Sequence, residues 1–173
     1  SKAIILPGDG AFAMAMRNLN DLGFIEPIKS YIANGGYFLG ICLGFQLLFT
    51  ESEEFGLTKG LDIIKGKVVR FKGEHLKIPH MGWNVVNPVK NDPVFESKEE
   101  ELRFYFVHSY VIEPAFWSDV RAFCEYGIKV PAVIRHGSVI ACQFHPEKSG
   151  EAGLRLLKNF CNSDYISVGV SSC

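Results

Sequence analysis

The sequence predicts an α/β fold with a mostly parallel central sheet, and three observations support this prediction. Short apolar runs of strand length lie at 3–6 and 37–41, as is typical of strands buried on both faces. Two stretches with helical spacing, at 11–22 and 24–34, separate these runs. A strand, a helical crossover and a second strand normally form a right-handed unit, which makes the two strands parallel.

The remaining elements follow from similar patterns along the chain. Glycines at 23 and 35–36 end the first two helices, and Pro27 is tolerated because it falls in the first turn of the second one. Apolar side chains recur at helical spacing over 43–52, and a hairpin is predicted at 61–64 and 67–71. Further strands are predicted at 103–107, 120–126, 132–135 and 138–144, and a last helix at 150–163.

The composition is that of one ordinary globular domain. Hydrophobic residues make up 47% and charged residues 21% of the 173 residues. We therefore expect a single domain with one sizeable core over residues 1–163. The tail at 164–173 shows no periodicity and is expected to lie outside this domain.

Charge and cysteine content argue against several classes of partner, and against disulfides and a zinc site. The 18 basic and 19 acidic residues nearly cancel, which argues against a nucleic acid or an acidic membrane as partner. Without a transmembrane run or a signal-peptide pattern, the expected location is the cytoplasm. Five cysteines without regular spacing fit reduced thiols better than disulfides or a zinc site. No metal and no other cofactor is expected.

The stretch Gly-Ile-Cys-Leu-Gly at 40–44 carries the first chemical motif. It places Cys42 on a sharp turn between a strand and a helix, where a nucleophile adopts a strained backbone and flanking glycines avoid collisions. The positive end of the following helix is expected to lower the pKa of the thiol and favour the reactive thiolate. On these residues alone, a buried cysteine on an ordinary turn is an equally good interpretation.

A second motif supplies a partner for Cys42. The strand at 138–144 runs into His-Pro-Glu-Lys at 145–148. Glu147 can hold one ring nitrogen of His145 while the other nitrogen faces the thiol, which completes a Cys-His-Glu triad. Two fitting motifs at strand ends arise by chance far less often than one. His80 and His108 are weaker candidates for the base, because neither has a carboxylate close behind it.

Five motifs together carry a family resemblance. They are Pro-Gly-Asp-Gly-Ala-Phe at 7–12, Gly-Ile-Cys-Leu-Gly-Phe-Gln at 40–46, Pro-His-Met-Gly-Trp-Asn at 79–84, Phe-Val-His-Ser-Tyr at 106–110 and Gln-Phe-His-Pro-Glu-Lys-Ser at 143–149. The chain, from residue 3 to about 160, resembles class I (triad-type) glutamine amidotransferases. The most similar branch is the family of glutaminase subunits of imidazole glycerol phosphate synthase.

This resemblance implies a particular form of the α/β class. It is the three-layer glutaminase fold, which is flavodoxin-like and adds an antiparallel portion to the mostly parallel sheet. The family carries a strand and a helix before the Pro-Gly segment, and neither is evident here. Either this sequence lacks a unit that the whole protein has, or the protein departs from the family, and in the second case we expect one edge of the sheet to lie bare.

The resemblance also implies roles for residues around the cysteine. One oxyanion-hole amide is placed at Asp9 or Gly10 and the other at Leu43; losing one such donor typically costs about 2.7–4 kcal/mol of barrier lowering. A carboxylate at Asp9 is unfavourable beside a developing negative charge unless it points outward. The residues implied to hold the substrate glutamine are Gly8, Gln46, His108, Ser109 and Tyr110.

The resemblance also implies that residues 79–84 form a loop near the active site, on the face that docks a partner subunit. The residues implied to lie on that face are Met81, Trp83, Asn84 and Lys148. Without the resemblance, the methionine and the tryptophan would be interpreted as core residues. The lysine would be interpreted as an ordinary solvated side chain.

The implied function is hydrolysis of L-glutamine to glutamate and ammonia through a thioester on Cys42. The implied partner, in a heterodimer, is a HisF-type cyclase subunit with a (β/α)8 barrel, which uses the ammonia to make imidazole glycerol phosphate in histidine biosynthesis. Low activity is expected without that partner. Two alternatives stay open: a paralogous glutaminase that feeds another synthase, such as a sugar-amidinating one, and a catalytically silent binding module on the same fold. A cysteine hydrolase acting on peptides fits less well, because Gln46 and the Pro-Gly loop suit a small amide.

Overall fold

The molecule is built around a six-stranded mixed sheet with the order β1-β2-β12-β11-β10-β7. It is known from a computed structural model that describes residues 2–72, 76–95 and 101–162. The strands of this sheet are β1 (Ala3–Leu6), β2 (Tyr37–Ile41), β7 (Asn87–Pro88), β10 (Val120–Glu125), β11 (Lys129–His136) and β12 (Val139–Cys142). The predicted tail at 164–173 lies outside the described residues.

Two of the five strand pairings in this sheet are parallel and three are antiparallel. β2 pairs in parallel with β1 on one side and with β12 on the other. The pairs β12-β11, β11-β10 and β10-β7 are antiparallel. The predicted α/β class with an added antiparallel portion is confirmed, although that portion is larger than expected. Among the described residues β1 is an edge strand.

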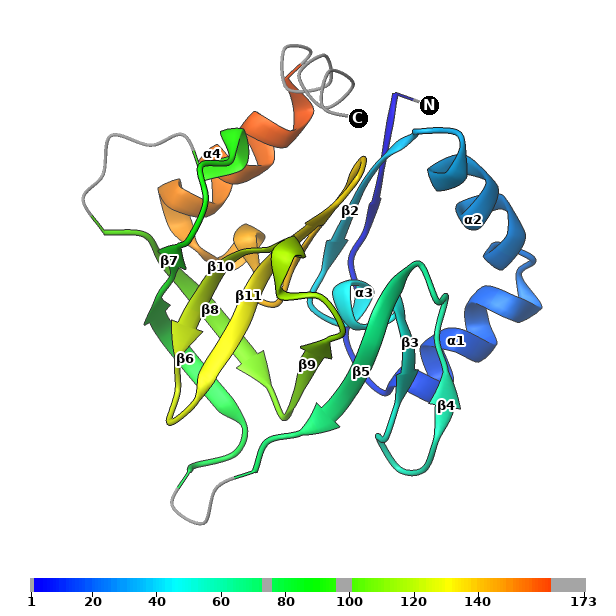
Figure 1. The fold of residues 1–173 in the computed structure, drawn as a ribbon, viewed down its shortest axis with the longest axis horizontal. Coiled ribbons are helices and arrows are strands. Elements are labelled where there is room, and N and C mark those ends of the chain that lie inside the picture. Colours follow the sequence, from blue (N-terminus) through cyan, green and yellow to red (C-terminus); the bar gives the residue numbers. More distant parts are fainter. Residues whose placement is uncertain (1, 73–75, 96–100, 163–173) are drawn as a thin grey trace.

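Both faces of the sheet are covered, which gives three layers. Side chains of β2 alternate between two buried clusters: Leu39 belongs to one and Phe38 to the other. On the Leu39 face lie α4 (Gly150–Cys161) and a two-stranded sheet of β6 (His80–Val85) and β8 (Arg103–His108). On the Phe38 face lie α1 (Phe12–Asp21) and α2 (Ile25–Ala33). Figure 1 shows α1 and α2 together on one side of the molecule and α4 on the other.

A second sheet, with the order β4-β3-β5-β9, packs against the Phe38 face. Its strands are β3 (Phe49–Ser52), β4 (Thr58–Lys59), β5 (Ile64–Arg70) and β9 (Tyr110–Pro114). The short helix α3 (Leu43–Gln46) leads into it, and three single 3-10 turns complete the described chain: η1 (Pro93–Phe95), η2 (Trp117–Asp119) and η3 (Pro146–Lys148).

Three local predictions were wrong. The helix expected over 43–52 ends as α3 at Gln46, and the chain turns into β3 because it pairs with β4 and β5. The hairpin expected within 61–71 is the single strand β5, whose partners are β3 and β9. The loop expected at 79–84 is mostly strand β6, which pairs with β8 from His80 to Val85. In all three places long-range pairing overrides the local pattern.

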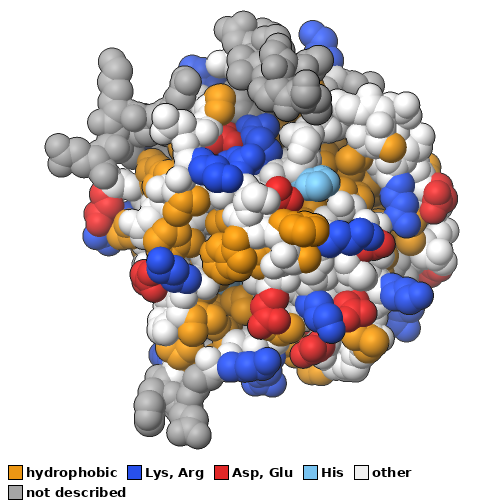
Figure 2. All heavy atoms as spheres, in the orientation of Figure 1, with side chains coloured by type: hydrophobic (Ala, Val, Ile, Leu, Met, Phe, Trp, Pro, Cys, Tyr) orange, Lys and Arg blue, Asp and Glu red, His pale blue; other side chains and the backbone are white. Residues whose placement is uncertain are grey.

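The surface carries charges of both signs. Figure 2 shows acidic and basic side chains interspersed with hydrophobic ones over the face it displays. In the described part of the chain, no helix is both long and apolar enough to cross a membrane.

Candidate active site

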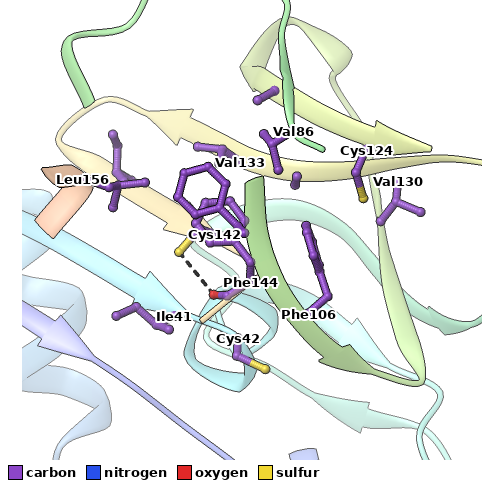
Figure 3. Close-up of a cluster of buried hydrophobic side chains, with 14 of the residues drawn as sticks. Ile41, Cys42, Val86, Phe106, Cys124, Val130, Val133, Cys142, Phe144 and Leu156 are labelled. Carbon is purple, nitrogen blue, oxygen red and sulfur yellow. Dashed lines mark hydrogen bonds between the residues drawn. The ribbon is translucent and has the colours of Figure 1, made fainter. Parts of the chain in front are cut away.

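Cys42 sits on a strained turn between β2 and α3. Its φ is 52° and its ψ −106°, a conformation that non-glycine residues rarely adopt. Two residues on, Gly44 tolerates no side chain, because an added Cβ would lie 1.9 Å from the carbonyl oxygen of Leu6. The strained backbone predicted for Cys42 is therefore present. Figure 3 shows this cysteine at the margin of the buried cluster that includes Ile41, Phe106 and Phe144.

The Pro-Gly loop packs directly against this turn. A Cβ at Gly8 would lie 2.9 Å from Cβ of Leu43, so only glycine allows this approach. In the same loop, the amide of Gly10 donates a hydrogen bond of 2.8 Å to Oδ1 of Asp9. Of the two amides predicted as oxyanion donors in this loop, at Asp9 or Gly10, the one at Gly10 is thus occupied by a carboxylate in this conformation.

A cavity of about 240 Å³ opens beside the cysteine. It brings together most of the residues that the sequence assigned to substrate and oxyanion binding. Its lining comprises Asp9, Gly10, Cys42, Leu43, Gln46, Glu54, Pro79, Val107, His108, Ser109 and Tyr110. Gly8 supports the lining from behind through its contact with Leu43.

His145 and Glu147 lie at the end of the neighbouring strand. β2 and β12 are parallel and adjacent, with Ile41 opposite Cys142, so both motifs leave the sheet at the same edge. Nδ1 of His145 is 2.7 Å from Oε1 of Glu147. The ring is buried, and its Nε2 is, within the described ranges, the one buried side-chain nitrogen or oxygen without a hydrogen-bond partner.

The thiol is held in its neutral form. Burial raises the pKa of Cys42 from 9.0 to about 12, the charges of Asp9 and Glu147 add to the rise, and the Leu43 amide opposes it. The predicted lowering of this pKa is therefore wrong for this conformation. The physical reason is that α3 has only four residues, so its dipole is too short to offset the loss of water around the sulfur.

The other two candidate bases are fully engaged. Nδ1 of His108 is 2.8 Å from the carbonyl oxygen of Tyr110, and its Nε2 is 2.9 Å from Nδ1 of His80. Nε2 of His80 is 3.2 Å from the amide nitrogen of Asn84. Burial lowers the pKa of His80 to about 4 and that of His108 to about 3, so both rings are neutral. Neither has a free nitrogen to offer Cys42.

Gln46 is buried and has the polar partners that the sequence predicted. Its Nε2 donates to the carbonyl oxygen of Tyr110 at 3.2 Å and to Oε1 of Gln143 at 3.0 Å. Gln143 in turn places its Nε2 3.8 Å from the sulfur of Cys42. No role was predicted for Gln143, although it begins the Gln-Phe-His-Pro-Glu motif at 143–147.

Glu54 lines the cavity and was not predicted from the sequence. It falls in a polar stretch of the chain, at 51–59. Its Oε2 accepts a hydrogen bond of 2.6 Å from the amide of Phe12, which ties the carboxylate to the start of α1. No local pattern in the sequence indicates that this glutamate reaches the cavity.

The residues predicted to dock a partner lie on or near β6. Met81 and Trp83 are 61% and 55% exposed, so the interpretation as core residues does not hold for them. Lys148 is exposed as well. Asn84 instead turns inward in part, because its amide nitrogen donates to the carbonyl oxygen of Glu125 and contacts His80.

Comparison with known proteins defines the class of protein. Residues 2–163 match the family model described as "Glutamine amidotransferase class-I". A solved "Crystal structure of glutamine amidotransferase" superposes with a TM-score of 0.69 at 19% identity, covering 92% of this chain and 79% of that one. At that identity the structural likeness shows the shared fold. The family model shows that the chain belongs to the class I glutamine amidotransferases.

Curated relatives narrow the class to one branch. An "Imidazole glycerol phosphate synthase subunit HisH" from Syntrophotalea carbinolica is 50% identical over 163 residues, covering 91% of this chain and 79% of that protein. The protein of the same name from Geobacter sulfurreducens is 49% identical over 166 residues, covering 92% and 79%. The branch to which the chain belongs is therefore the HisH type.

Proposed function

We propose that this protein is a glutaminase subunit that hydrolyses L-glutamine and passes the ammonia to a cyclase subunit making imidazole glycerol phosphate. One observation carries the proposal. A strained cysteine opens onto a cavity with room for an amino acid, at the same sheet edge as a buried histidine that has one free nitrogen. This is the arrangement that thiol-based amide hydrolysis needs.

Cys42 and His145 carry out the first half of the reaction. The sulfur attacks the side-chain amide carbon of glutamine while Nε2 of His145 takes the thiol proton. Nε2 then gives that proton to the amide nitrogen, which leaves as ammonia, and a thioester stays on Cys42. Water, deprotonated by the same nitrogen, attacks the thioester and releases glutamate and the thiol.

Glu147 orients the base. Its carboxylate accepts the Nδ1 hydrogen of His145 at 2.7 Å, which fixes the tautomer in which Nε2 carries no proton. The lack of any other partner for Nε2 among the described residues fits this role. The backbone amide of Leu43, which already interacts with the sulfur, is one donor for the oxyanion, and the amide of Gly10 is the second once Asp9 releases it.

The cavity lining suits the rest of the substrate. Glu54 places a carboxylate at its wall, which favours the α-ammonium group of an amino acid. Gln46 has both of its N–H groups committed to Tyr110 and Gln143. Its side-chain oxygen is therefore the group that it offers to a substrate.

The isolated chain is built to be slow. The high pKa of Cys42 and the occupied amide of Gly10 both oppose the reaction. The exposed Met81 and Trp83 provide a site where a cyclase subunit docks and shifts this state. Such coupling prevents the loss of glutamine when no acceptor for the ammonia is present.

The test is the rate of glutamine hydrolysis by the purified chain, alone and with a cognate cyclase subunit. We expect a low rate alone, a large stimulation by the cyclase with its ligand, and no activity in Cys42→Ala. Equal rates with and without the cyclase would refute the coupling. No hydrolysis under either condition would favour the silent binding module, and stimulation by a different synthase only would favour the paralogous glutaminase.

A further inference from the structure

Gln143 occupies a position that no step of the proposed reaction yet uses. It follows β12 directly and has no exposed surface. Its side chain lies between Gln46 and Cys42, with Oε1 3.0 Å from Nε2 of Gln46 and Nε2 3.8 Å from the sulfur. The hydrogen-bonding groups of a buried side-chain amide are normally all paired. The question is therefore which atoms of Gln143 donate and which accept.

The direction is fixed by the carbonyl group of Tyr110. A carbonyl oxygen only accepts hydrogen bonds, so Gln46 must present its nitrogen to it. The second N–H of that nitrogen then donates to Gln143, so the side-chain oxygen of Gln143 must be the acceptor. Gln143 is left with its N–H groups toward Cys42. The reverse orientation of either amide would oppose like groups.

The same carbonyl is anchored from its other side. Nδ1 of His108 donates to it, Nε2 of His108 accepts from Nδ1 of His80, and Nε2 of His80 accepts from the amide of Asn84. Each ring therefore has a single possible tautomer, and both rings are neutral. The ring of His80 stacks on those of Phe106 and Tyr126, which restrains this end of the chain of hydrogen bonds.

We infer that Gln143 is a further catalytic residue, whose side-chain N–H stabilises the negative charge on the sulfur of Cys42 when the thiolate forms. The inference rests on the proposed role of Cys42 as nucleophile. In the resting thiol, the sulfur is 4.0 Å from the carbonyl oxygen of Val107, which accepts the S–H hydrogen. Once that hydrogen leaves, the buried charge needs donors, and Gln143 joins the Leu43 amide in supplying them.

The experiment is Gln143→Met, which keeps the length of the side chain and removes its donor. The matched control is Cys142→Ala, which perturbs the adjacent buried position without touching the sulfur of Cys42. Both are made in a chain whose Cys161 and Cys173 are replaced by serine. The rate constant for alkylation of Cys42 by iodoacetamide is measured by peptide mass between about pH 6.5 and 9.5. Turnover of glutamine is measured with the cyclase present.

We expect alkylation of Gln143→Met to slow roughly tenfold at each pH, the change that one hydrogen bond to a charged group produces. The kcat should fall by a similar factor, with KM little changed because Gln46 keeps its bond to Tyr110. The control should react at the parent rate. A Gln143→Met protein that is folded, by circular dichroism, and reacts at the parent rate would overturn the inference.

A second measurement covers the case in which Gln143→Met does not fold. The chain contains only two glutamines, Gln46 and Gln143, so side-chain ¹⁵N labelling of glutamine gives two amide pairs. Replacing Cys42 by serine should shift the Gln143 pair, and two unmoved pairs would contradict the contact. Failure of the proposed function shows differently, as a parent protein that does not hydrolyse glutamine even with its cyclase.

Discussion

At the scale of single residues, Asp9 is the group that most directly opposes the proposed reaction. Its carboxylate accepts the Gly10 hydrogen bond and contributes to the high pKa of Cys42. The first effect occupies a donor that the oxyanion needs, and the second helps to keep the nucleophile protonated. The side chain of Asp9 therefore contributes to both features that make the resting state slow.

Replacing Asp9 separates these effects. Asp9→Ala removes the acceptor and frees the Gly10 amide, so the rate of glutamine hydrolysis by the isolated chain should rise roughly tenfold or more, part of what one oxyanion donor supplies. Asp9→Asn is the matched control, because its side-chain oxygen can still accept from Gly10 while the charge is lost. Steady-state assays without cyclase give the comparison. Equal rates for the two variants would show that the hydrogen bond does not hold the rate down.

The raised pKa of Cys42 predicts how its reactivity depends on pH. Only the thiolate is alkylated, and with a pKa of about 12 its fraction grows with pH through the whole working range. Alkylation of Cys42 in the isolated chain should therefore rise about tenfold for each pH unit between about 7 and 10, without a plateau. The rate is followed by mass spectrometry of the peptide that carries Cys42. A plateau near neutral pH would mean that the thiolate is already formed at rest.

At the scale of elements, the turn between β2 and α3 depends on the close approach of β1. Gly44 lies against the backbone of Leu6, and neither element can move without disturbing the sheet. The position of Cys42 thus depends on two parallel strands.

Gly44→Ala should therefore lower both stability and activity. The added methyl group forces backbone atoms apart, which we expect to cost about 1–3 kcal/mol of unfolding free energy. It should also abolish glutamine hydrolysis, because the turn that aims the sulfur is displaced. Gly23→Ala is a suitable control, because Gly23 has a left-handed backbone and an added Cβ there would contact nothing. The backbone strain should lower the unfolding free energy by about 1–2 kcal/mol without affecting the turn at Cys42. If Gly44→Ala kept full activity, the turn would not be needed to position the sulfur.

The sequence predicted the parts of this site that depend on local chemistry. Gly44 marks the turn because an added Cβ there would collide with Leu6, and His145 and Glu147 lie only two residues apart in the chain. It failed where distant elements meet. Glu54 reaches the cavity only because β3 turns the chain back, and the helix predicted after Cys42 is cut short by that same strand. The pKa of Cys42 was mispredicted because burial depends on layers that the local pattern does not contain.

At the scale of the whole molecule, one two-stranded sheet connects β6, the strand proposed to dock the cyclase, with the cavity beside Cys42. β6 carries the exposed Met81 and Trp83, and pairs with β8, whose last residue, His108, lines the cavity. A partner bound on β6 would therefore be separated from the cavity by the single strand β8.

The exposed tryptophan on β6 should be an anchor for the cyclase. Trp83→Ala is expected to weaken the complex at least about thirtyfold, as loss of a buried interface tryptophan commonly does. Unfolding free energy should barely change, since the ring is 55% exposed in the free chain. Trp117→Ala is the matched control, because this ring is also 55% exposed but lies outside β6. Binding is measured by calorimetry, and equal losses for both variants would place the interface elsewhere.

The central claim is that Cys42 is the nucleophile that attacks glutamine, and a covalent glutamine analogue tests it most directly. The protein, with its cyclase, is treated with a glutamine-like diazoketone, and the site of modification is mapped by peptide mass. We predict one equivalent of label on Cys42, slowed by excess glutamine and absent when His145 is replaced by alanine. Label on another cysteine, or none on Cys42 in an otherwise active complex, would contradict the proposed role of Cys42.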